Sequence, residues 1–256
     1  MPALEIRQIP VLSDNYVYLV HDPAGGATAA VDPAVVEPVV AALDATGWRL
    51  SHVLNTHHHM DHVGGNLALK KRYGCIVVGS RADADRIPGL DLAVGEGDEI
   101  EVGAARARVF DVPGHTRGHV AYWFAGDRAL FCGDTLFALG CGRLFEGTPE
   151  QMWESLAKLR ALPGDARVYC AHEYTLANAR FALSVDPDNE ALAERAREVE
   201  RARAAGRPTV PSTMAEECAT NPFLRPDSAT LQATLGLVGA EPAAVFAETR
   251  RRKDGF

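Results

Sequence analysis

The sequence predicts a layered α/β fold over its first two thirds, followed by a smaller region made of helices. Short apolar runs rich in β-branched and aromatic residues alternate with helical patterns as far as residue 171. Beyond that residue there is no convincing strand pattern, and three long helical patterns follow. A chain of 256 residues with 47% hydrophobic content can bury the core that such a fold requires. We therefore expect an α/β domain over residues 1–172 and a helical domain over residues 173–256.

Each expected element rests on a local pattern. The expected strands are the apolar runs at residues 4–9, 16–20, 28–31, 52–55, 76–78, 107–112, 120–124, 129–132 and 168–171. The expected helices lie at residues 35–45, 65–73, 149–162, 176–184, 189–205 and 228–252. Thr148 is a suitable N-cap for the third of these helices, because Pro149 then occupies its first position. Between residues 190 and 207, Glu and Arg alternate at near-helical spacing, which predicts a solvated, ion-paired helix face rather than an RNA-binding one.

Composition excludes several classes of protein. The net charge of -8 argues against a general nucleic-acid binder, which needs a basic face to neutralise phosphates. The N-terminus lacks the features of a secretory signal, and no apolar run approaches the ~18 residues of a membrane span. The five cysteines are odd in number and form no C-x-x-C pair, so a disulfide scaffold or thiolate zinc site is not expected. We expect a cytoplasmic monomer that binds neither nucleic acid nor membrane.

A dense histidine cluster is the strongest functional signal. Four of the nine histidines lie in the six residues His57-His58-His59-Met60-Asp61-His62, directly after the expected strand at residues 52–55. Histidine and aspartate are the nitrogen and oxygen donors that Zn²⁺ prefers. In an extended segment alternate residues face the same side, so His57 and His59 can share a metal while His58 points away. A surface polyhistidine tract is the alternative, but Asp61 interrupts the cluster and a helix follows it.

Three further donors come directly after expected strands. His115 follows the run at 107–112, Asp134 follows the run at 129–132, and His172 follows the run at 168–171. Strand ends form the functional rim of α/β sheets, so these loops are expected to converge on one cavity. Together with the cluster they give seven candidate ligands: His57, His59, Asp61, His62, His115, Asp134 and His172.

Seven donors are too many for a single catalytic metal. A tetrahedral catalytic zinc uses three protein ligands and an open position. If Asp134 bridges two ions, each receives three further protein ligands and a shared water, which is the arrangement of a two-metal hydrolytic site. The donors accept Zn²⁺, iron or manganese, and we expect two divalent ions, with Zn²⁺ first among them.

The ligand motifs resemble those of the metallo-β-lactamase superfamily. Thr56-His57-His58-His59-Met60-Asp61-His62 looks like its T-H-x-H-x-D-H signature, and the later donors follow in the same order and spacing. The resemblance implies a four-layer αβ/βα sandwich. It also implies one metal on His57, His59 and His115, a second on Asp61, His62 and His172, and Asp134 as the bridge. We expect His119 and Asp32 to support the ligands rather than to bind metal.

The C-terminal region resembles the glyoxalase II, or hydroxyacylglutathione hydrolase, family of that superfamily. Residues 209–217, residues 221–225 and the closing Arg250-Arg251-Arg252-Lys253-Asp254 are similar to stretches peculiar to this family. The resemblance implies that Arg250 and Lys253 grip the glycine carboxylate of glutathione. It adds three further substrate contacts, which are Arg143, Phe145 and Tyr174. Arg143 stands where the family often has Lys, and Phe145 replaces a Tyr of the animal enzymes, which removes one hydroxyl donor.

Charge chemistry supports the same assignment. Arg250 and Lys253 are three residues apart on an expected helix, so they present two cations on one face to an anionic ligand. The alternative is a basic helix end that complements the helix dipole.

The resemblance implies hydrolysis of S-(2-hydroxyacyl)glutathione thioesters, in particular S-D-lactoylglutathione, to glutathione and D-lactate. This is the second step of methylglyoxal detoxification. A hydroxide held between the two metals would attack the thioester carbonyl, with Asp61 and Asp134 as the catalytic aspartates. The alternatives are a glutathione persulfide dioxygenase with a single iron, another hydrolase of the superfamily, and a non-catalytic zinc-binding protein.

Overall fold

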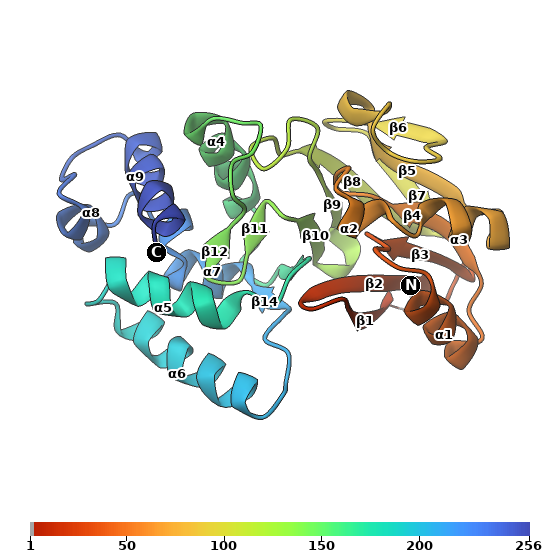
Figure 1. The fold of residues 1–256 in the computed structure, drawn as a ribbon, viewed down its shortest axis with the longest axis horizontal. Helices are drawn as coiled ribbons and strands as arrows, with labels where there is room; N and C mark the ends of the chain where they lie inside the picture. Colours follow the sequence, from red (N-terminus) through yellow and green to blue (C-terminus); the bar gives the residue numbers. More distant parts are fainter. Residues whose placement is uncertain (1–2) are drawn as a thin grey trace. The chain divides into compact units, whose positions relative to one another are not determined.

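The computed structural model describes residues 3–256, and its contacts divide the chain into two compact units. The first unit contains the chain up to Asp111 together with Arg117–Gly133. The second unit contains Val112–Thr116 and Asp134–Phe256. The elements of both units are drawn in Figure 1.

A mixed six-stranded sheet begins the first unit. Its strands follow chain order: β1 (Glu5–Val11), β2 (Asn15–Asp22), β3 (Ala27–Val31), β4 (Leu50–Leu54), β5 (Ile76–Ser80) and β6 (Leu92–Val94). β2 is antiparallel to both of its neighbours, β1 and β3, whereas β3 to β6 run parallel. Parallel strands are normally covered on both faces, and the carboxyl ends of β3 and β4 are accordingly apolar and buried.

An antiparallel sheet and three helices cover the mixed sheet of the first unit. The sheet contains β7 (Glu99–Val102), β8 (Ala105–Asp111), β9 (Val120–Phe124) and β10 (Ala129–Gly133), and the helices are α1 (Glu37–Thr46), α2 (Met60–Val63) and α3 (Asn66–Tyr73). Alternate residues of β2 face opposite sides, so Leu19 packs with Leu43 of α1 whereas the ring of Tyr18 lies 5.4 Å from the ring of Phe131 in β10. The mixed sheet is therefore sandwiched between helices and the second sheet.

The second unit is mostly helical. Its strands are the pair β11 (Leu136–Phe137) and β12 (Gly140–Cys141) and the pair β13 (Arg167–Cys170) and β14 (Ser212–Thr213). Its helices are α4 (Pro149–Arg160), α5 (Thr175–Val185), α6 (Glu190–Ala204), α7 (Met214–Thr220), α8 (Ala229–Leu235) and α9 (Pro242–Asp254). Small and branched residues of α5 and α6 interlock, and Phe223 contacts both Phe181 and Phe246, with ring centroids 5.9 and 5.8 Å away. Aromatic packing thus ties α5 to the C-terminal helix.

Several sequence predictions differ from the structure. The helix expected at residues 228–252 is two helices, because α8 ends at Gly236 with φ of 75° and α9 begins at Pro242. The two-residue strand β14 lies beyond residue 171, where no strand was expected, and it is too short to leave a readable pattern. The strands β6 and β7 and the helix α7 were also not expected.

The expectation of a fully solvated charged face on α6 is wrong in part. Arg195 is only 11% exposed and forms an ion pair with the fully buried Glu217. Arg195 also donates to the hydroxyl of Thr220 over 2.6 Å. A buried ion pair requires such extra hydrogen bonds, so this arginine fixes α6 to α7.

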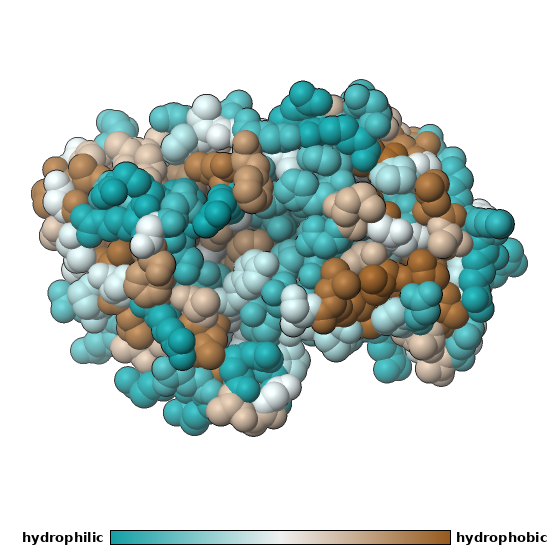
Figure 2. Space-filling model, viewed as in Figure 1, coloured by the Kyte–Doolittle hydropathy of each residue, from teal (hydrophilic) through white to brown (hydrophobic). Residues whose placement is uncertain are grey.

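Surface and cysteine properties agree with the composition. Hydrophilic residues cover most of the face shown in Figure 2, with apolar patches between them. Among the described residues, none of the helices has the length and apolar character needed to cross a membrane.

All five cysteines are free thiols, and burial raises the pKa of Cys141 to about 11 and that of Cys170 to about 12. These two thiols are therefore not reactive at neutral pH.

Thr148 caps α4 as the sequence predicts, and this cap gives a test of the fold. The Thr148 hydroxyl accepts from the Gln151 N–H, and the Gln151 side chain accepts from the Thr148 N–H. We expect Thr148→Ala to lower the free energy of unfolding by about 1 kcal/mol in urea denaturation. Thr148→Ser keeps the hydroxyl and is expected to retain most of that stability. Equal stability of Ala and wild type would contradict the capping role.

Candidate metal centre

The loop that follows β4 is anchored by one buried aspartate. Asp32 follows the parallel neighbour β3, and its N–H donates to the Leu54 carbonyl over 3.0 Å. Its two carboxylate oxygens accept from the Thr56 N–H at 2.8 Å and from the Thr56 hydroxyl at 2.7 Å. Because the Thr56 hydroxyl donates its hydrogen bond to the carboxylate, the Thr56 oxygen can accept from Nδ1–H of His57, which lies 3.1 Å away. The tautomer of His57 is thereby set with its lone pair on Nε2, the nitrogen that faces His59.

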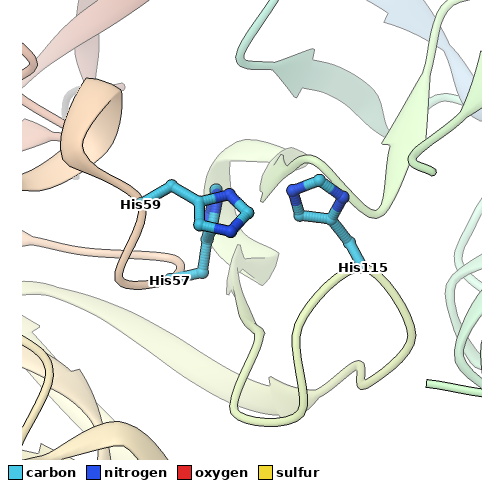
Figure 3. A group of neighbouring side chains, drawn as sticks. All are labelled: His57, His59 and His115. Atoms are coloured by element: carbon cyan, nitrogen blue, oxygen red, sulfur yellow. The ribbon is translucent and has the colours of Figure 1, made fainter. Parts of the chain in front are cut away.

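His57 and His59 converge as the sequence predicts. The His57 Nε2 and His59 Nδ1 atoms are 3.0 Å apart. Figure 3 shows both rings projecting from the loop after β4, and His115 projecting from the loop after β8. Two imidazole nitrogens at this separation are suited to share one cation.

Asp61 and His62 lie on α2, the single helical turn that follows. The His62 Nδ1 is 3.1 Å from an Asp32 oxygen, and its Nε2 is 3.5 Å from an Asp61 oxygen. Asn15 at the start of β2 donates to the same Asp61 oxygen over 3.0 Å. Asp32 therefore orients His62 as well as His57, and Asn15 holds the Asp61 carboxylate in place.

The second unit contributes His115, Asp134 and His172. One Asp134 oxygen is 3.4 Å from the His115 Nε2, and the other is 3.4 Å from the His172 Nε2. The His115 Nδ1 donates to the Arg143 carbonyl over 2.8 Å, so Nε2 is again the nitrogen left for metal. The ring of Tyr174 stacks on His172 with centroids 4.7 Å apart and planes 5° apart. A carboxylate that offers one oxygen to each of two imidazoles has the geometry of a bridging ligand.

Two histidines near these donors have other roles. His58 lies 3.2 Å from the buried Asp83 carboxylate and 3.0 Å from an Arg86 nitrogen, which agrees with its expected orientation away from His57. The buried His119 ring stacks on His57 with centroids 4.7 Å apart. Gly133 permits this packing, because a Cβ there would meet the Thr56 hydroxyl at 2.3 Å.

Seven histidine and aspartate side chains belong to groups that could hold a metal ion. These are His57, His59, Asp61, His62, His115, Asp134 and His172. They are the same seven donors that the sequence predicts. Imidazole nitrogens and carboxylate oxygens fit divalent zinc, iron or manganese, so this donor set suits the metals that the motifs imply.

The predicted glutathione contacts all lie in the second unit. Arg250 is buried, with its Nη1 donating to the Cys141 carbonyl over 3.1 Å and its guanidinium 5.2 Å from the Phe223 ring. The Lys253 ammonium lies 5.1 Å from the Phe181 ring, and burial and the nearby Arg250 lower its pKa. The side chains of the other three contacts are exposed: Arg143, Phe145 and Tyr174.

Sequence reasoning missed two residues that contact the histidine cluster from distant parts of the chain. Asn15, which donates to Asp61, is 46 residues from it, and Asp83, which pairs with the non-ligand His58, is 25 residues from it. Neither stands in a local motif. Asn15 is the first residue of the apolar strand β2, and Asp83 lies three residues after the apolar strand β5, so each is a polar residue beside an apolar run.

Comparison with known proteins defines the class. A family model described as "Metallo-beta-lactamase superfamily" matches residues 12–172, and one described as "Hydroxyacylglutathione hydrolase C-terminus" matches residues 173–256. Residues 12–172 thus belong to the metallo-β-lactamase superfamily, and the predicted fold class is confirmed. A curated relative from Methylococcus capsulatus, named hydroxyacylglutathione hydrolase, is 66% identical and covers 99% of both chains. One of the same name from Rhodospirillum rubrum is 58% identical over the full length of both. The chain belongs to the hydroxyacylglutathione hydrolase family.

Solved structures support the same fold. The ETHE1 crystal structure from Myxococcus xanthus is 27% identical, with a TM-score of 0.67 over 97% of this chain and 98% of that one. TTHA1623 in a di-iron-bound form is 24% identical, with a TM-score of 0.60 over 84% of this chain and 98% of that one. At this level of identity the second similarity shows the fold alone.

The position of Asp32 predicts an effect on metal affinity. Asp32→Ala removes the carboxylate that lies against His62 and that orients His57 through Thr56, so we expect metal affinity to fall about 10–100-fold. Competition with a chromogenic chelator measures this. Asp22→Ala is the matched control, because Asp22 is also a buried aspartate of the first unit but accepts from the N–H groups of Ala24 and Ala104. Equal losses of metal affinity in both variants would show that Asp32 has no specific role.

Proposed function

We propose that this chain hydrolyses S-(2-hydroxyacyl)glutathione thioesters, with S-D-lactoylglutathione yielding glutathione and D-lactate. The observation that carries the proposal is Asp134, whose two oxygens face His115 and His172, beside a set of cationic side chains that suits an anionic conjugate. The names of the full-length relatives support the same reaction.

The proposed centre holds two divalent ions, most simply Zn²⁺. His57, His59 and His115 would bind one ion, Asp61, His62 and His172 would bind the other, and Asp134 would bridge them. Two ions held there would supply the positive charge that lowers the pKa of water and stabilises a tetrahedral oxyanion. Asp61, fixed by Asn15, can also orient the attacking water, so Asp61 and Asp134 are the proposed catalytic aspartates.

The proposed reaction needs no protein nucleophile. A water molecule gives up a proton to solvent as its oxygen bonds to the thioester carbonyl carbon, the carbon–sulfur bond breaks, and glutathione leaves with the electron pair as a thiolate. A thiol with a pKa near 8.5 is a good leaving group at neutral pH. The departing thiolate then takes up a proton from solvent.

Substrate recognition is proposed to use the cations of the second unit. Arg250, Lys253 and Arg143 offer donors to the carboxylates of glutathione, and the Tyr174 ring stacked on His172 lies beside the ligands. Phe145 lies 5.2 Å from the His115 ring, so it can contact the substrate but lacks a hydroxyl donor. We propose further that residues 1–172 form the catalytic domain and residues 173–256 the substrate-binding domain of a cytoplasmic monomer.

A glutathione persulfide dioxygenase is the alternative within the superfamily. It would need a single iron and would lack the complete second set of donors. This chain has Asp61, His62 and His172, with the two histidines buried, so the donor set favours the two-metal hydrolase.

Adjacent histidines allow a matched test of the metal ligands. We expect His59→Ala to lower kcat/KM for S-D-lactoylglutathione about 10²–10³-fold, because transition-state charge loses part of its stabilisation. His58→Ala changes the neighbouring residue, which faces Asp83, and is expected to keep its metal content and activity near wild type. Wild-type turnover by His59→Ala or Asp134→Ala would refute the two-metal proposal.

The glutathione moiety gives a second test. Hydrolysis of S-D-lactoylglutathione should exceed that of the D-lactoyl thioester of N-acetylcysteamine by about 10²-fold in kcat/KM, since the simple thioester lacks both carboxylates. Metal content is measured on the same sample. Equal rates on both thioesters would remove glutathione from the proposal while leaving thioester hydrolysis intact.

A further inference from the structure

Asp254 stands at an unfavourable place for a carboxylate. It is the last residue of α9, whose final turn also contains the cations Arg251, Arg252 and Lys253. The C-terminal end of a helix carries partial negative charge, which favours cations and disfavours an aspartate. The position of Asp254 therefore requires compensation from other groups.

Two arginines provide that compensation, Arg250 one turn earlier on α9 and Arg143 from a distant segment of the chain. One oxygen of Asp254 lies 2.9 Å from Nη2 of Arg250 and 3.5 Å from Nε of Arg143. The two guanidinium groups thus share a single carboxylate oxygen. Without a negative charge between them, two like charges would repel each other and the more mobile one would move away.

The two arginines differ in how firmly they are held. Arg250 is 7% exposed, donates to the Cys141 carbonyl over 3.1 Å and lies over the Phe223 ring, so its guanidinium is fixed without Asp254. Arg143 is 60% exposed. An exposed arginine samples many rotamers, so an ion pair restricts the rotamers of Arg143 more than those of the buried Arg250.

We propose that Asp254 is a positioning residue that draws the exposed Arg143 guanidinium to the buried Arg250 guanidinium and so completes a two-arginine site for the glycine carboxylate of glutathione; this rests on the function proposed above. The ion pair uses Nε of Arg143, so it does not require the two terminal nitrogens with which a guanidinium grips a carboxylate.

A competing role predicts the opposite effect. If Asp254 occupied the place of the substrate carboxylate, its removal would strengthen substrate binding. These contacts favour positioning, because the Cys141 carbonyl already holds the Arg250 guanidinium, whereas the exposed Arg143 guanidinium is paired with Asp254. KM therefore decides between the two roles by its direction.

The test compares Asp254→Asn with wild type on S-D-lactoylglutathione and on its analogue with the glycine carboxylate converted to an amide. We expect Asp254→Asn to raise KM for the natural thioester about fivefold to tenfold, as for loss of one charge-assisted contact, with kcat within about twofold. KM for the amide should not change. The control is Glu248→Gln on the same helix, because Glu248 pairs with Arg251 and Arg252 and its loss should leave both KM values unaltered.

A double-mutant cycle shows whether Asp254 acts through Arg143. In an Arg143→Met background, which already has the higher KM, Asp254→Asn should add less than about twofold. A lower or unchanged KM in Asp254→Asn, or the same increase with and without Arg143, overturns the inference. If wild type binds acid and amide equally, glutathione-carboxylate recognition fails, and the inference fails with it. If wild type prefers the acid to the amide and Asp254→Asn keeps that preference in full, only the role of Asp254 is overturned.

Discussion

The hydrogen bonds of Asp32 are the constraint on which the metal centre depends. Its carboxylate accepts from Thr56 and lies against His62, and Thr56 in turn orients His57. One buried charge therefore fixes the backbone at the end of β4 and two ligands that are five residues apart. Parallel pairing of β3 with β4 brings the carboxyl ends of the two strands side by side, so the sheet itself determines that Asp32 meets Thr56.

In the second unit a backbone carbonyl, rather than a carboxylate, orients a histidine. The Arg143 carbonyl fixes the His115 tautomer, while the Arg143 side chain reaches Asp254 and, in the proposed function, the substrate. In the proposed function, metal binding and substrate binding would thus share Arg143. A change in the loop that carries Arg143 would alter both the orientation of His115 and the ion pair with Asp254.

Much of the site could be predicted because its ligands follow strand ends in short motifs. Short sequence patterns are enough to predict these residues: the spacing of the donors in the cluster at residues 57–62, and the apolar run before Asp134. Asn15, which fixes Asp61, could not be predicted, and neither could the Asp83 and Arg86 contacts of the neighbouring His58, because these pairings are set by the tertiary fold. The fold shows the same limit: the cap at Thr148 is local and was predicted, whereas the break of residues 228–252 into α8 and α9 depends on a glycine and a proline within a continuous helical pattern.

Metal stoichiometry during turnover tests the central claim most directly. Metal-free protein is titrated with Zn²⁺ while bound metal and hydrolysis of S-D-lactoylglutathione are measured on the same sample. The seven donors predict that binding saturates at about two ions per chain and that the fully loaded protein hydrolyses the thioester. Saturation at one ion, or a protein loaded with two ions that leaves the thioester intact, would contradict the account.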